Sequence, residues 1–492
     1  MYRKKNRKLV NLPMLARVAG WLLMIEALFM LIPLITCLVY DEDDWLCFAV
    51  TAAVTGVTGL LLSRRIHPNH YGMGKRDGFL LTAMVWVIFS IFGMVPFMFC
   101  HYSLSVSNAF FEAMSGFTTT GASVLQDVSH MSHGVHIWRA TMQWLGGMGI
   151  ILFTLAVIPM LNSSGGMLMF NAEVTGITHD KLRPRISQTA KALWLIYFAL
   201  TAMLVLLLWA GPMNFFDSLC HAFGAISTGG YSTRNDGIAA YGSNYIKIIL
   251  TIFMFIGGVN FSLIFRTARG EFKALHRNDV FGTYVGIILV MYVLFVIGIV
   301  KQGSYDTWED LTINPLFQIV STITSTGFTP TNFEKWGPLV LSLVFLLMLF
   351  GACAGSTSGG AKIDRLLFLI KNCRNELYRC IYPHAIMSVR VNGRVVSGDV
   401  VNKVIAFLCI YMLLIGIGGT VLAAMDVPII DAYFSAFSCM SNTGLGAGIT
   451  GFGGSYDMLP DAAKWVLSFL MLTGRLEIFT VLLLLAPSFW RK

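Results

Sequence analysis

Apolar runs long enough to cross a lipid bilayer recur along the whole chain and constrain its fold more than any other feature. Ten runs reach a suitable length, at residues 14–40, 44–63, 77–100, 136–160, 189–211, 244–265, 280–300, 337–363, 402–425 and 462–488. A hydrocarbon core about 30 Å thick requires about 20 apolar residues in a helix. Because only 12% of the residues are charged and 56% are hydrophobic, the chain is predicted to be a polytopic membrane protein.

The positions of Lys and Arg predict the orientation of these spans. If the chain starts in the cytoplasm and crosses at every run, each inner segment is basic, including 3–8, 63–76 and 362–394. The outer segments include the acidic 41–44 and also 426–461, which has four Asp and no Lys or Arg. This distribution follows the positive-inside rule, so both termini are expected in the cytoplasm. The net charge of +9 is then explained by topology, and no nucleic acid is expected as a partner.

Other functional classes find little support in the sequence. The nine cysteines form no Cys-x-x-Cys pair and no metal-ligand spacing with His, so they are interpreted as packing residues. The first apolar run follows a basic start but lacks a small-residue cleavage site, so it is expected to remain as a spanning helix. The scattered His, Asp and Ser residues do not suggest a nucleophile with its base, and an enzyme or a receptor is disfavoured.

Four outer segments between the spans are too short and too mixed in composition to cross the membrane. They cover residues 107–123, 215–232, 314–329 and 431–448. Each opens with about ten mainly apolar residues, the length of a re-entrant helix, and ends in hydroxyl, amide and glycine residues. At the same distance from the short helix, each contains one of the glycines Gly121, Gly230, Gly327 and Gly444.

This recurrence predicts an internal repeat of span, short helix, glycine-bearing strand and span. The four glycines are 109, 97 and 117 residues apart, and the first two spans stand outside the repeat. We therefore predict an all-α membrane fold of ten transmembrane helices, with four pseudo-symmetric repeats around one pore and two extra N-terminal helices. The predicted domains are 1–70 for the two-helix region and 71–180, 181–273, 274–395 and 396–492 for the repeats.

Such a repeat suits the binding of a dehydrated cation. Irregular backbone at membrane depth is tolerated only where protein buries it or where it lines a water-filled cavity. Glycine permits backbone angles that turn carbonyl oxygens toward a shared axis, where they can replace the hydration shell of an alkali cation. The predicted selectivity filter consists of Thr119, Thr120, Gly121, Thr228, Gly229, Gly230, Ser325, Thr326, Gly327, Asn442, Thr443 and Gly444.

These four segments, in four span–short helix–span repeats, resemble the Trk/Ktr/HKT superfamily of potassium transporters. The two extra N-terminal spans resemble its bacterial TrkH branch, and the resemblance covers essentially the whole chain. It implies potassium uptake across the bacterial inner membrane through a filter that keeps only the central glycine in all four copies. In the family, a serine in place of the first-repeat glycine accompanies sodium permeation, so Gly121 favours potassium.

The resemblance also implies partners. It predicts a homodimer in which each protomer holds its own pore, bound on its cytoplasmic face to a TrkA-type ring of nucleotide-binding regulatory domains. The basic 362–394 segment and the other inner loops offer docking surfaces for that ring. No cofactor is expected to be bound by the chain itself, because potassium is the transported species.

The eighth apolar run ends in a glycine-rich stretch that predicts a break in the helix. Each glycine costs about 1 kcal/mol relative to alanine in a helix interior. The residues concerned are Gly351, Gly355, Ser356, Thr357, Ser358, Gly359 and Gly360. In the family, an intramembrane loop at this place obstructs the pore and moves on opening, so these residues are the candidate gate. Packing of small residues between helices is the alternative, whereas a phosphate-binding loop does not fit the pattern.

Arg475 lies near the middle of the last apolar run. A charge there costs about 2.5–3.5 kcal/mol on insertion scales and usually faces a cavity or a partner. In the family's corresponding helix a basic residue projects into the pore beneath the filter, where Arg475 would act as an electrostatic barrier. The alternative is a structural ion pair, for instance with Glu112 of the first short helix.

The remaining polar residues allow more than one interpretation. Glu26 in the first span is expected to pack or to hydrogen-bond between helices rather than to carry a proton. His221 and Gln318 are expected to be buried anchors for the filter, and Asp217 and Asp431 either attract cations or cap the short helices. Symport of potassium with protons or sodium is the alternative function. Four repeats in one orientation, without a carboxylate in the filter segments, favour a channel-like path instead.

Overall fold

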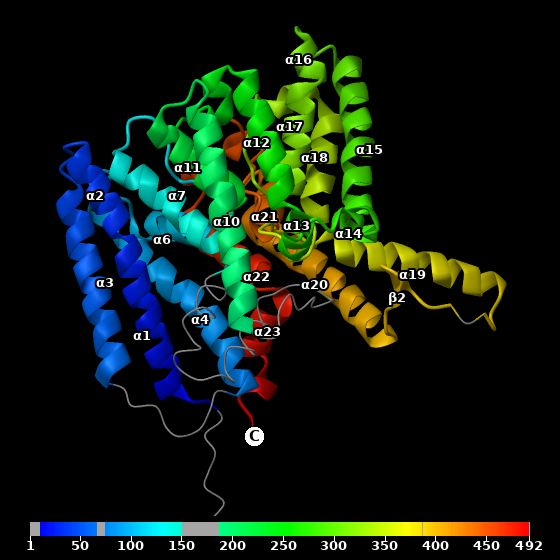
Figure 1. Cartoon of the computed structure of the whole chain (residues 1–492), viewed down its shortest axis with the longest axis horizontal. Coiled ribbons are helices and arrows are strands. Elements are labelled where there is room, and N and C mark those ends of the chain that lie inside the picture. Colours follow the sequence, from blue (N-terminus) through cyan, green and yellow to red (C-terminus); the bar gives the residue numbers. More distant parts are fainter. Residues whose placement is uncertain (1–9, 66–73, 150–185, 386, 492) are drawn as a thin grey trace, which may run out of the picture.

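The computed structural model describes residues 10–65, 74–149, 186–385 and 387–491. Most regular elements in these residues are α-helices, and these helices run mostly side by side (Figure 1). The only strands among them, β1 (Arg390–Val391) and β2 (Arg394–Val395), form one short antiparallel pair. The prediction of a helical membrane fold is confirmed at this level.

Six stretches of the described residues are long and apolar enough to span a bilayer. They are Leu12–Val39, Trp45–Arg65, Arg76–Phe99, Lys191–Trp209, Asp279–Gln302 and Gly398–Ala423. The number rises to eight if each of two bent helix pairs is counted as one span. The second half of the predicted run 136–160 lies outside the described residues, and the count of ten spans stays a prediction.

Two of these spans consist of two helices each. The helices of the six stretches are α1 (Leu12–Phe29), α2 (Leu31–Val39), α3 (Trp45–Arg65), α4 (Lys75–Gly93), α5 (Val95–Phe99), α10 (Ile186–Trp209), α15 (Asp279–Gln302) and α20 (Gly398–Ala423). Pro33 and Pro96 explain the two interruptions, because a proline has no N–H and its ring clashes with the carbonyl four residues earlier. The helices α1 and α4 therefore stop just before them.

Four short helices lie inside the bundle. They are α6 (Val106–Phe117), α11 (Phe215–Ile226), α17 (Ile313–Ile323) and α21 (Ile429–Met440). Nearly every residue in the second half of each helix is buried, polar residues included. Their lengths and positions agree with the re-entrant helices expected from the sequence.

The helices that follow the short helices are α7 (His133–Gly147), α12 (Asn244–Gly257), α13 (Phe261–Ala268), α18 (Pro338–Phe350), α19 (Ile363–Ile381), α22 (Asp461–Arg475) and α23 (Ile478–Leu485). Those of the second, third and fourth repeats are bent or interrupted. The angle between α12 and α13 is 104°, and that between α22 and α23 is 117°. The sequence predicts an interruption only within 337–363, which is confirmed by the end of α18 at Phe350. The bends within 244–265 and 462–488 are not predicted by it.

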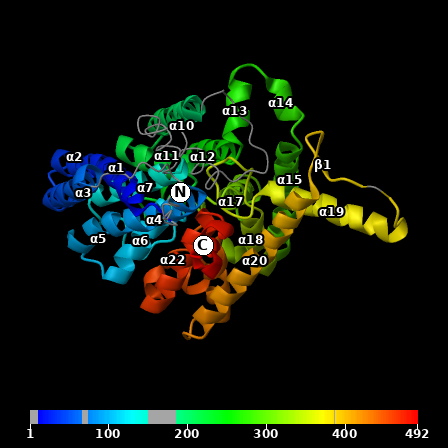
Figure 2. The same cartoon turned by 90° about the horizontal axis from the view of Figure 1, so that it is seen from below.

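Short elements complete the described chain at its two surfaces. Two are the α-helices α14 (Phe272–His276) and α16 (Trp308–Leu311). The others are 3₁₀ helices, labelled η2 (Gly237–Tyr241), η3 (Phe333–Trp336), η4 (Gly448–Thr450), η5 (Tyr456–Met458) and η6 (Pro487–Phe489). The helix α19 extends away from the bundle in both views (Figures 1 and 2).

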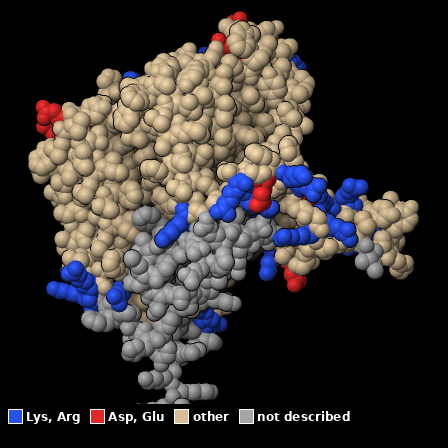
Figure 3. Space-filling view, in the orientation of Figure 1, with Lys and Arg blue, Asp and Glu red and all other residues tan. Residues whose placement is uncertain are grey.

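The surface has the composition of a membrane protein. Large apolar side chains of the outer helices are exposed, such as Val54 (55%), Leu195 (70%), Leu289 (60%) and Leu413 (58%). Lys and Arg gather along α19 and around the lower end of the bundle, whereas groups of Asp and Glu lie at the opposite end (Figure 3). An apolar middle with charge at its two ends fits a bilayer around the bundle.

Candidate cation-binding site

Each short helix ends in the same cap, the Schellman motif, in which a left-handed residue follows the helix. The four left-handed residues are Thr119, Thr228, Ser325 and Asn442, with φ of 54°, 55°, 53° and 53°. In the first repeat, the N–H of Thr119 donates to the carbonyl of Gly116 at 3.0 Å and that of Thr120 donates to Ser115 at 2.9 Å. Equivalent bonds occur in the other three caps. The cap turns the chain sharply at the end of each short helix.

Two residues further on, each segment has a left-handed glycine. These are Gly121, Gly230, Gly327 and Gly444, with φ of 83°, 79°, 82° and 75°. Glycine is favoured here because other residues are strained in this conformation. The recurring glycine of the sequence is therefore required by the backbone of all four segments.

The four glycines also place the segments next to one another in a closed ring. A Cβ at Gly121 would lie 2.2 Å from the oxygen of Gly229, at Gly230 1.8 Å from that of Thr326, at Gly327 2.1 Å from that of Thr443, and at Gly444 2.2 Å from that of Thr120. Each segment thus touches the next, and the fourth touches the first. The twelve predicted filter residues are brought together, and no side chain fits between neighbouring segments at the glycine positions.

The ring carries backbone carbonyls without protein partners. Within the described residues, no backbone or side-chain donor reaches the carbonyls of the four left-handed residues or of the four glycines. More than nine in ten buried backbone polar groups are normally hydrogen-bonded. The four left-handed residues are buried and the four glycines are partly exposed, so these eight carbonyls are available to water or to a cation, and oxygen ligands of this kind suit an alkali cation.

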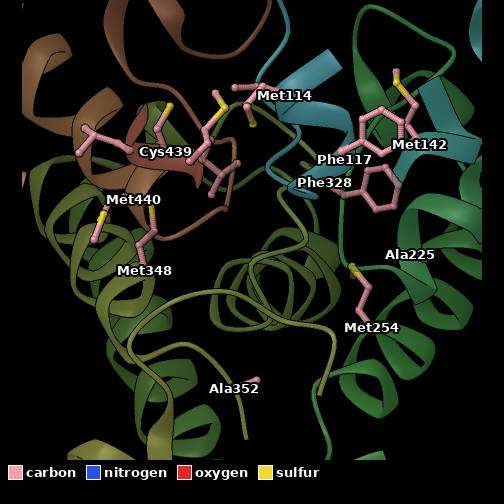
Figure 4. Close-up of a cluster of buried hydrophobic side chains, with 14 of the residues drawn as sticks. Met114, Phe117, Met142, Ala225, Met254, Phe328, Met348, Ala352, Cys439 and Met440 are labelled. Atoms are coloured by element: carbon pink, nitrogen blue, oxygen red, sulfur yellow. The ribbon is translucent and has the colours of Figure 1, made fainter. Parts of the chain in front are cut away.

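Apolar side chains surround the ring. Figure 4 shows Met114, Phe117, Met142 and Phe328 among the buried residues near the loops that follow the short helices. A low-dielectric shell of this kind strengthens the attraction between a cation and the few dipoles that face it. In the described residues, no group of three or more His, Cys, Asp and Glu could hold a metal ion.

A buried ion pair contacts the chain just after the first filter segment. Arg139 of α7 donates through Nε to Oε1 of Glu112 at 2.8 Å, and both side chains are buried. The carboxylate also accepts the N–H of Val124 at 3.0 Å, and the Arg139 guanidinium lies 4.0 Å from the centre of the Tyr231 ring. Breaking a buried pair of this kind costs about 3–5 kcal/mol. The sequence did not identify Arg139, which joins the first segment to the loop after the second.

Polar residues at the position of Glu112 lie on the other short helices as well. His221 is fully buried and bonds to Ser232 Oγ at 2.9 Å, while Gln318 donates to Thr322 Oγ1 at 3.2 Å. The contact of His221 with the loop after the second segment fits the expected role of a buried anchor, whereas the contact given for Gln318 lies within its own helix and does not reach the filter. Asp217 does not cap its helix, because the side chain of Asn214 accepts the N–H of Asp217 at 2.6 Å. Asp431 does not cap α21 either, since the residue at that position is Pro428.

The glycine-rich stretch forms a non-helical loop, the 351–362 loop, directly against the ring. Gly359 donates its N–H to Ser325 Oγ at 2.5 Å, and a Cβ at Gly359 would lie 2.2 Å from the carbonyl oxygen of Ser441. Thr357 Oγ1 donates to the carbonyl of Ile226 at 3.1 Å, at the end of α11. The loop therefore contacts the C-terminal ends of three short helices.

The glycines of this loop are required by its backbone as well as by packing. Gly351, Gly355 and Gly360 have φ of 63°, 76° and 75°. Ser356 and Ser358 bond to each other through their hydroxyls at 2.9 Å. Left-handed backbone at three positions excludes a continuous helix, so helix–helix packing of small residues does not account for this stretch.

The bend of the second repeat holds one side of the loop. Phe261 N–H donates to the carbonyl of Gly355 at 3.0 Å, and Cys353 N–H donates to that of Gly258 at 3.1 Å. The side-chain amide of Asn260 donates to the carbonyl of Ala354 at 2.6 Å. The bend between α12 and α13 thus supplies the surface on which the loop rests.

The bend between α22 and α23 in the fourth repeat contacts the other side of the 351–362 loop. Arg475 is the last residue of α22, so it lies at the break in the middle of the predicted run 462–488 rather than inside a continuous helix. Its guanidinium donates to the carbonyl of Thr357 at 2.9 Å and to those of Gly146 and Gly147 at the end of α7. It forms no ion pair with Glu112, whose carboxylate is already paired with Arg139. Arg475 therefore joins the loop to the first repeat.

A second charged contact lies beside Arg475. Arg365, in the first turn of α19, forms an ion pair with Glu477 in the bend between α22 and α23. Its guanidinium also lies 3.9 Å from the centre of the Phe407 ring. Glu477 itself has a left-handed φ of 57°, a strained conformation for a residue with a side chain. The bend is thus tied to the middle of the 351–362 loop through Arg475 and to the helix that follows the loop through Glu477.

Comparison with known proteins places this geometry in a family. The family model of the TrkH cation transport proteins matches residues 47–276 and 282–492. The Trk system potassium uptake protein TrkH of Salmonella typhimurium is 35% identical over 485 residues, which cover 97% of this chain and 99% of the relative. The protein of the same name from Halomonas elongata is 34% identical over 489 residues, covering 98% and 100%.

A solved structure has the same fold. The crystal structure of the potassium transporter TrkH from Vibrio parahaemolyticus matches with a TM-score of 0.88 at 32% identity, over 98% of this chain and 100% of that one. The relatives are named as transporters, which confirms the prediction of a transport protein rather than an enzyme. The family model, the relatives and the shared fold agree over nearly the whole length, and the chain belongs to the TrkH family of cation transport proteins.

Proposed function

We propose that this protein takes up potassium across the bacterial cytoplasmic membrane through a channel-like selectivity filter. The observation that carries the proposal is the closed ring of left-handed glycines, whose carbonyl oxygens accept no hydrogen bond from the described residues. Removing water from a cation costs tens of kcal/mol by Born estimates, so a nearly complete cage of oxygens is required. Four segments with equivalent backbone can supply one, and the relatives are named potassium uptake proteins, which agrees with Gly121 in the first segment.

The wider architecture belongs to the same proposal. Ten transmembrane helices, of which eight form four repeats around one pore, would bring one filter segment from each repeat to the axis. The partially negative C-terminal ends of the short helices would then face the cation. Both termini would lie in the cytoplasm, on the basic side of the bundle.

The gate is assigned to the 351–362 loop and Arg475. The loop lies against three short-helix ends, and Arg475 bonds to it from the fourth repeat. A positive charge beneath the filter opposes cation passage and, through Thr357, is joined to the loop. Movement of the loop would therefore change both the width of the path and the position of the charge.

The partners are proposed on the family resemblance and the shape of the basic face. A homodimer with one pore in each protomer would bind a cytosolic TrkA-type ring. The protruding α19 carries much of the positive surface seen in Figure 3 and is the docking element we propose. Regulation would reach the gate directly, because the 351–362 loop continues into α19.

Radioactive rubidium uptake into liposomes containing the purified protein tests the filter. When an outward potassium gradient makes the vesicle interior negative, a folded protein should accumulate rubidium. Excess potassium should compete with rubidium for transport more strongly than excess sodium. A folded protein that moves neither ion would refute the proposal. Vesicles without protein and vesicles treated with an unrelated membrane protein provide the controls.

Coupling to protons remains the second candidate, and Glu26 is the observation that favours it. This carboxyl group is fully buried in α1, and neither oxygen has a hydrogen-bond partner among the described residues. Of the two roles expected for Glu26, an interhelical hydrogen bond is therefore not found among the described residues, and packing is left. If transport is coupled, the reversal potential should shift with the proton gradient, and Glu26→Gln should abolish that shift. A reversal potential set by potassium alone would establish the uncoupled path.

A further inference from the structure

The four filter segments differ at the residue that precedes the left-handed glycine. In three of them it is threonine, and its hydroxyl lies 2.8 Å from the hydroxyl of the residue that ends the short helix. The three pairs are Thr120–Thr118, Thr326–Thr324 and Thr443–Ser441. The second segment has Gly229 instead, so it lacks this hydroxyl.

The backbone does not require a glycine at this position. Gly229 lies outside the left-handed region, unlike Gly230, so a side chain would be compatible with its backbone angles. Another side chain occupies the space that a side chain at Gly229 would need. A Cβ at Gly229 would lie 2.4 Å from Cδ and 2.6 Å from Oε1 of Gln143. The side chain of Gln143 therefore occupies the volume that threonine fills in the other three segments.

Gln143 comes from α7 of the first repeat and is fully buried. Its Nε2 donates to the carbonyl of Gly229 at 2.7 Å, and its Oε1 accepts the N–H of Tyr231 at 3.1 Å. A carbonyl and an N–H as the two partners fix the orientation of the amide, since the reverse orientation would oppose like groups. The side chain thus bridges the two peptide groups on either side of Gly230.

This contact reaches the ring itself. The Gly229 oxygen is the atom that a Cβ at Gly121 would meet at 2.2 Å. The equivalent oxygens of Thr120, Thr326 and Thr443 accept no hydrogen bond from the described residues. Only the second segment is therefore held by a donor at this carbonyl, and that donor belongs to the neighbouring repeat.

We propose that Gln143 is a positioning residue that determines ion selectivity, by holding the second filter segment in place of the missing threonine. The inference rests on the proposed function, because it assumes that the ring is the filter. Without the amide, the Gly229 carbonyl and the Tyr231 N–H lose their shared partner, and Gly230 is free to change its left-handed conformation. The oxygen cage would then adapt more readily to an ion of another size.

The test compares variants by the ratio of rubidium to sodium flux in liposomes. Gln143→Met keeps the volume of the side chain and removes both hydrogen bonds. We expect the ratio to fall about tenfold, within the range that one unsatisfied buried polar group produces. In the double variant Q143A/G229T, a threonine can occupy the vacated volume and reach the Ser227 hydroxyl, so the ratio should recover. Gln302→Ala, an exposed glutamine at the end of α15, is the control and should keep the wild-type ratio.

The melting temperature in detergent separates selectivity from stability. A Gln143→Met protein that is folded and as selective as the wild type would overturn the inference while leaving the proposed function intact. If this variant does not fold, the double variant decides: a folded double variant with the wild-type ratio supports the substitution of Gln143 for threonine, and one without selectivity overturns it. A wild-type protein that moves no rubidium would overturn the proposed function and the inference together.

Discussion

At the scale of single residues, four side chains occupy a backbone conformation that favours glycine. They are Thr119, Thr228, Ser325 and Asn442. An ordinary residue in the left-handed region costs about 1–2 kcal/mol, and a cap that only ended a helix would be better made by glycine. The contacts of two of them give a reason for the side chain: Ser325 accepts the N–H of Gly359, and Asn442 donates to Thr120 Oγ1 at 3.0 Å. Strain retained in four equivalent places is typical of a functional site.

Gly121→Ser is expected to weaken the discrimination of potassium from sodium. A Cβ at Gly121 would collide with the Gly229 oxygen, so the second segment must move outward. We expect the rubidium-to-sodium flux ratio to fall by about tenfold or more, a difference of about 1.4 kcal/mol. Gly242→Ser is the matched control, because Gly242 also has a left-handed φ but has open space around it. An unchanged ratio in a folded Gly121→Ser protein would contradict the filter assignment.

Arg475→Ala is expected to raise basal flux without changing the order of ion selectivity. The substitution removes a positive charge and its bonds to Thr357 and to the end of α7. A barrier lower by about 1.4 kcal/mol would raise the rate about tenfold, which rubidium uptake would detect. Arg475→Lys, which keeps the charge but not the planar donor group, separates the two effects. If the alanine variant conducted as the wild type does, Arg475 would be a structural residue only.

At the scale of elements, the bends explain how irregular backbone is accommodated inside a membrane. Glycines near the ends of α7 and α22 let these helices approach the last carbonyl of a short helix: a Cβ at Gly146 would lie 1.9 Å from the Phe117 oxygen, and one at Gly474 2.0 Å from the Met440 oxygen. The Gly146 and Gly147 carbonyls at the end of α7 accept hydrogen bonds from Arg475. At the bend between α12 and α13, backbone groups bond to the 351–362 loop. Such bends are tolerated because protein, not lipid, surrounds them.

Disturbing the 351–362 loop is expected to open the path. Gly359→Ala places a Cβ against the Ser441 oxygen and pushes the loop away from the short helices, and deletion of 351–360 removes most of it. Both variants should raise basal rubidium flux, the deletion more strongly. Removing the 390–395 hairpin, which lies beside α19 and outside the ring, is the control. Wild-type flux in both folded variants would show that the loop only packs.

At the scale of the whole molecule, the ring exists only because four distant segments meet. Each contributes a few residues, and no segment could form the carbonyl ring alone. The buried Glu112–Arg139 pair and the Gln143 amide show how neighbouring repeats hold one another at the correct spacing. A substitution in one repeat should therefore displace the filter segment of the next repeat, as the Gly121 substitution is expected to show.

Thiol labelling should establish the orientation of the bundle. The exposed Cys373 and Cys380 lie on α19, which is predicted to be cytoplasmic, whereas Asp43 lies in the turn before α3 on the predicted outer side. In intact cells, a membrane-impermeant maleimide should label an Asp43→Cys variant and should reach Cys373 and Cys380 only after permeabilisation. Replacing the exposed Cys409 of α20 by serine removes its background. Labelling of α19 from outside would reverse the proposed topology.

Sequence reasoning was most successful where a local pattern has one physical cause. Apolar length identified six of the ten predicted spans, or eight if each bent pair is one span, and the recurring Gly121 position identified segments that the structure brings together. It was wrong about a possible Arg475–Glu112 pair, because Arg139 one helix further on reaches that carboxylate first. It also did not identify Gln143, since a single glutamine in an apolar helix has no local signature of its partners, which lie 86 and 88 residues away in the chain.

By itself, the sequence determined that the chain is a membrane protein, that four short helices end in a glycine-bearing turn, and that a helix is interrupted at residue 350. These features follow from hydrophobic length and from the backbone freedom of glycine, which are local properties. Only the tertiary structure decided which charges pair, where the other helices bend, and which side chain replaces the absent threonine. Those outcomes depend on which helix surfaces pack against each other in the folded bundle. A buried polar group without a partner costs free energy, so each one pairs with a group that lies close to it.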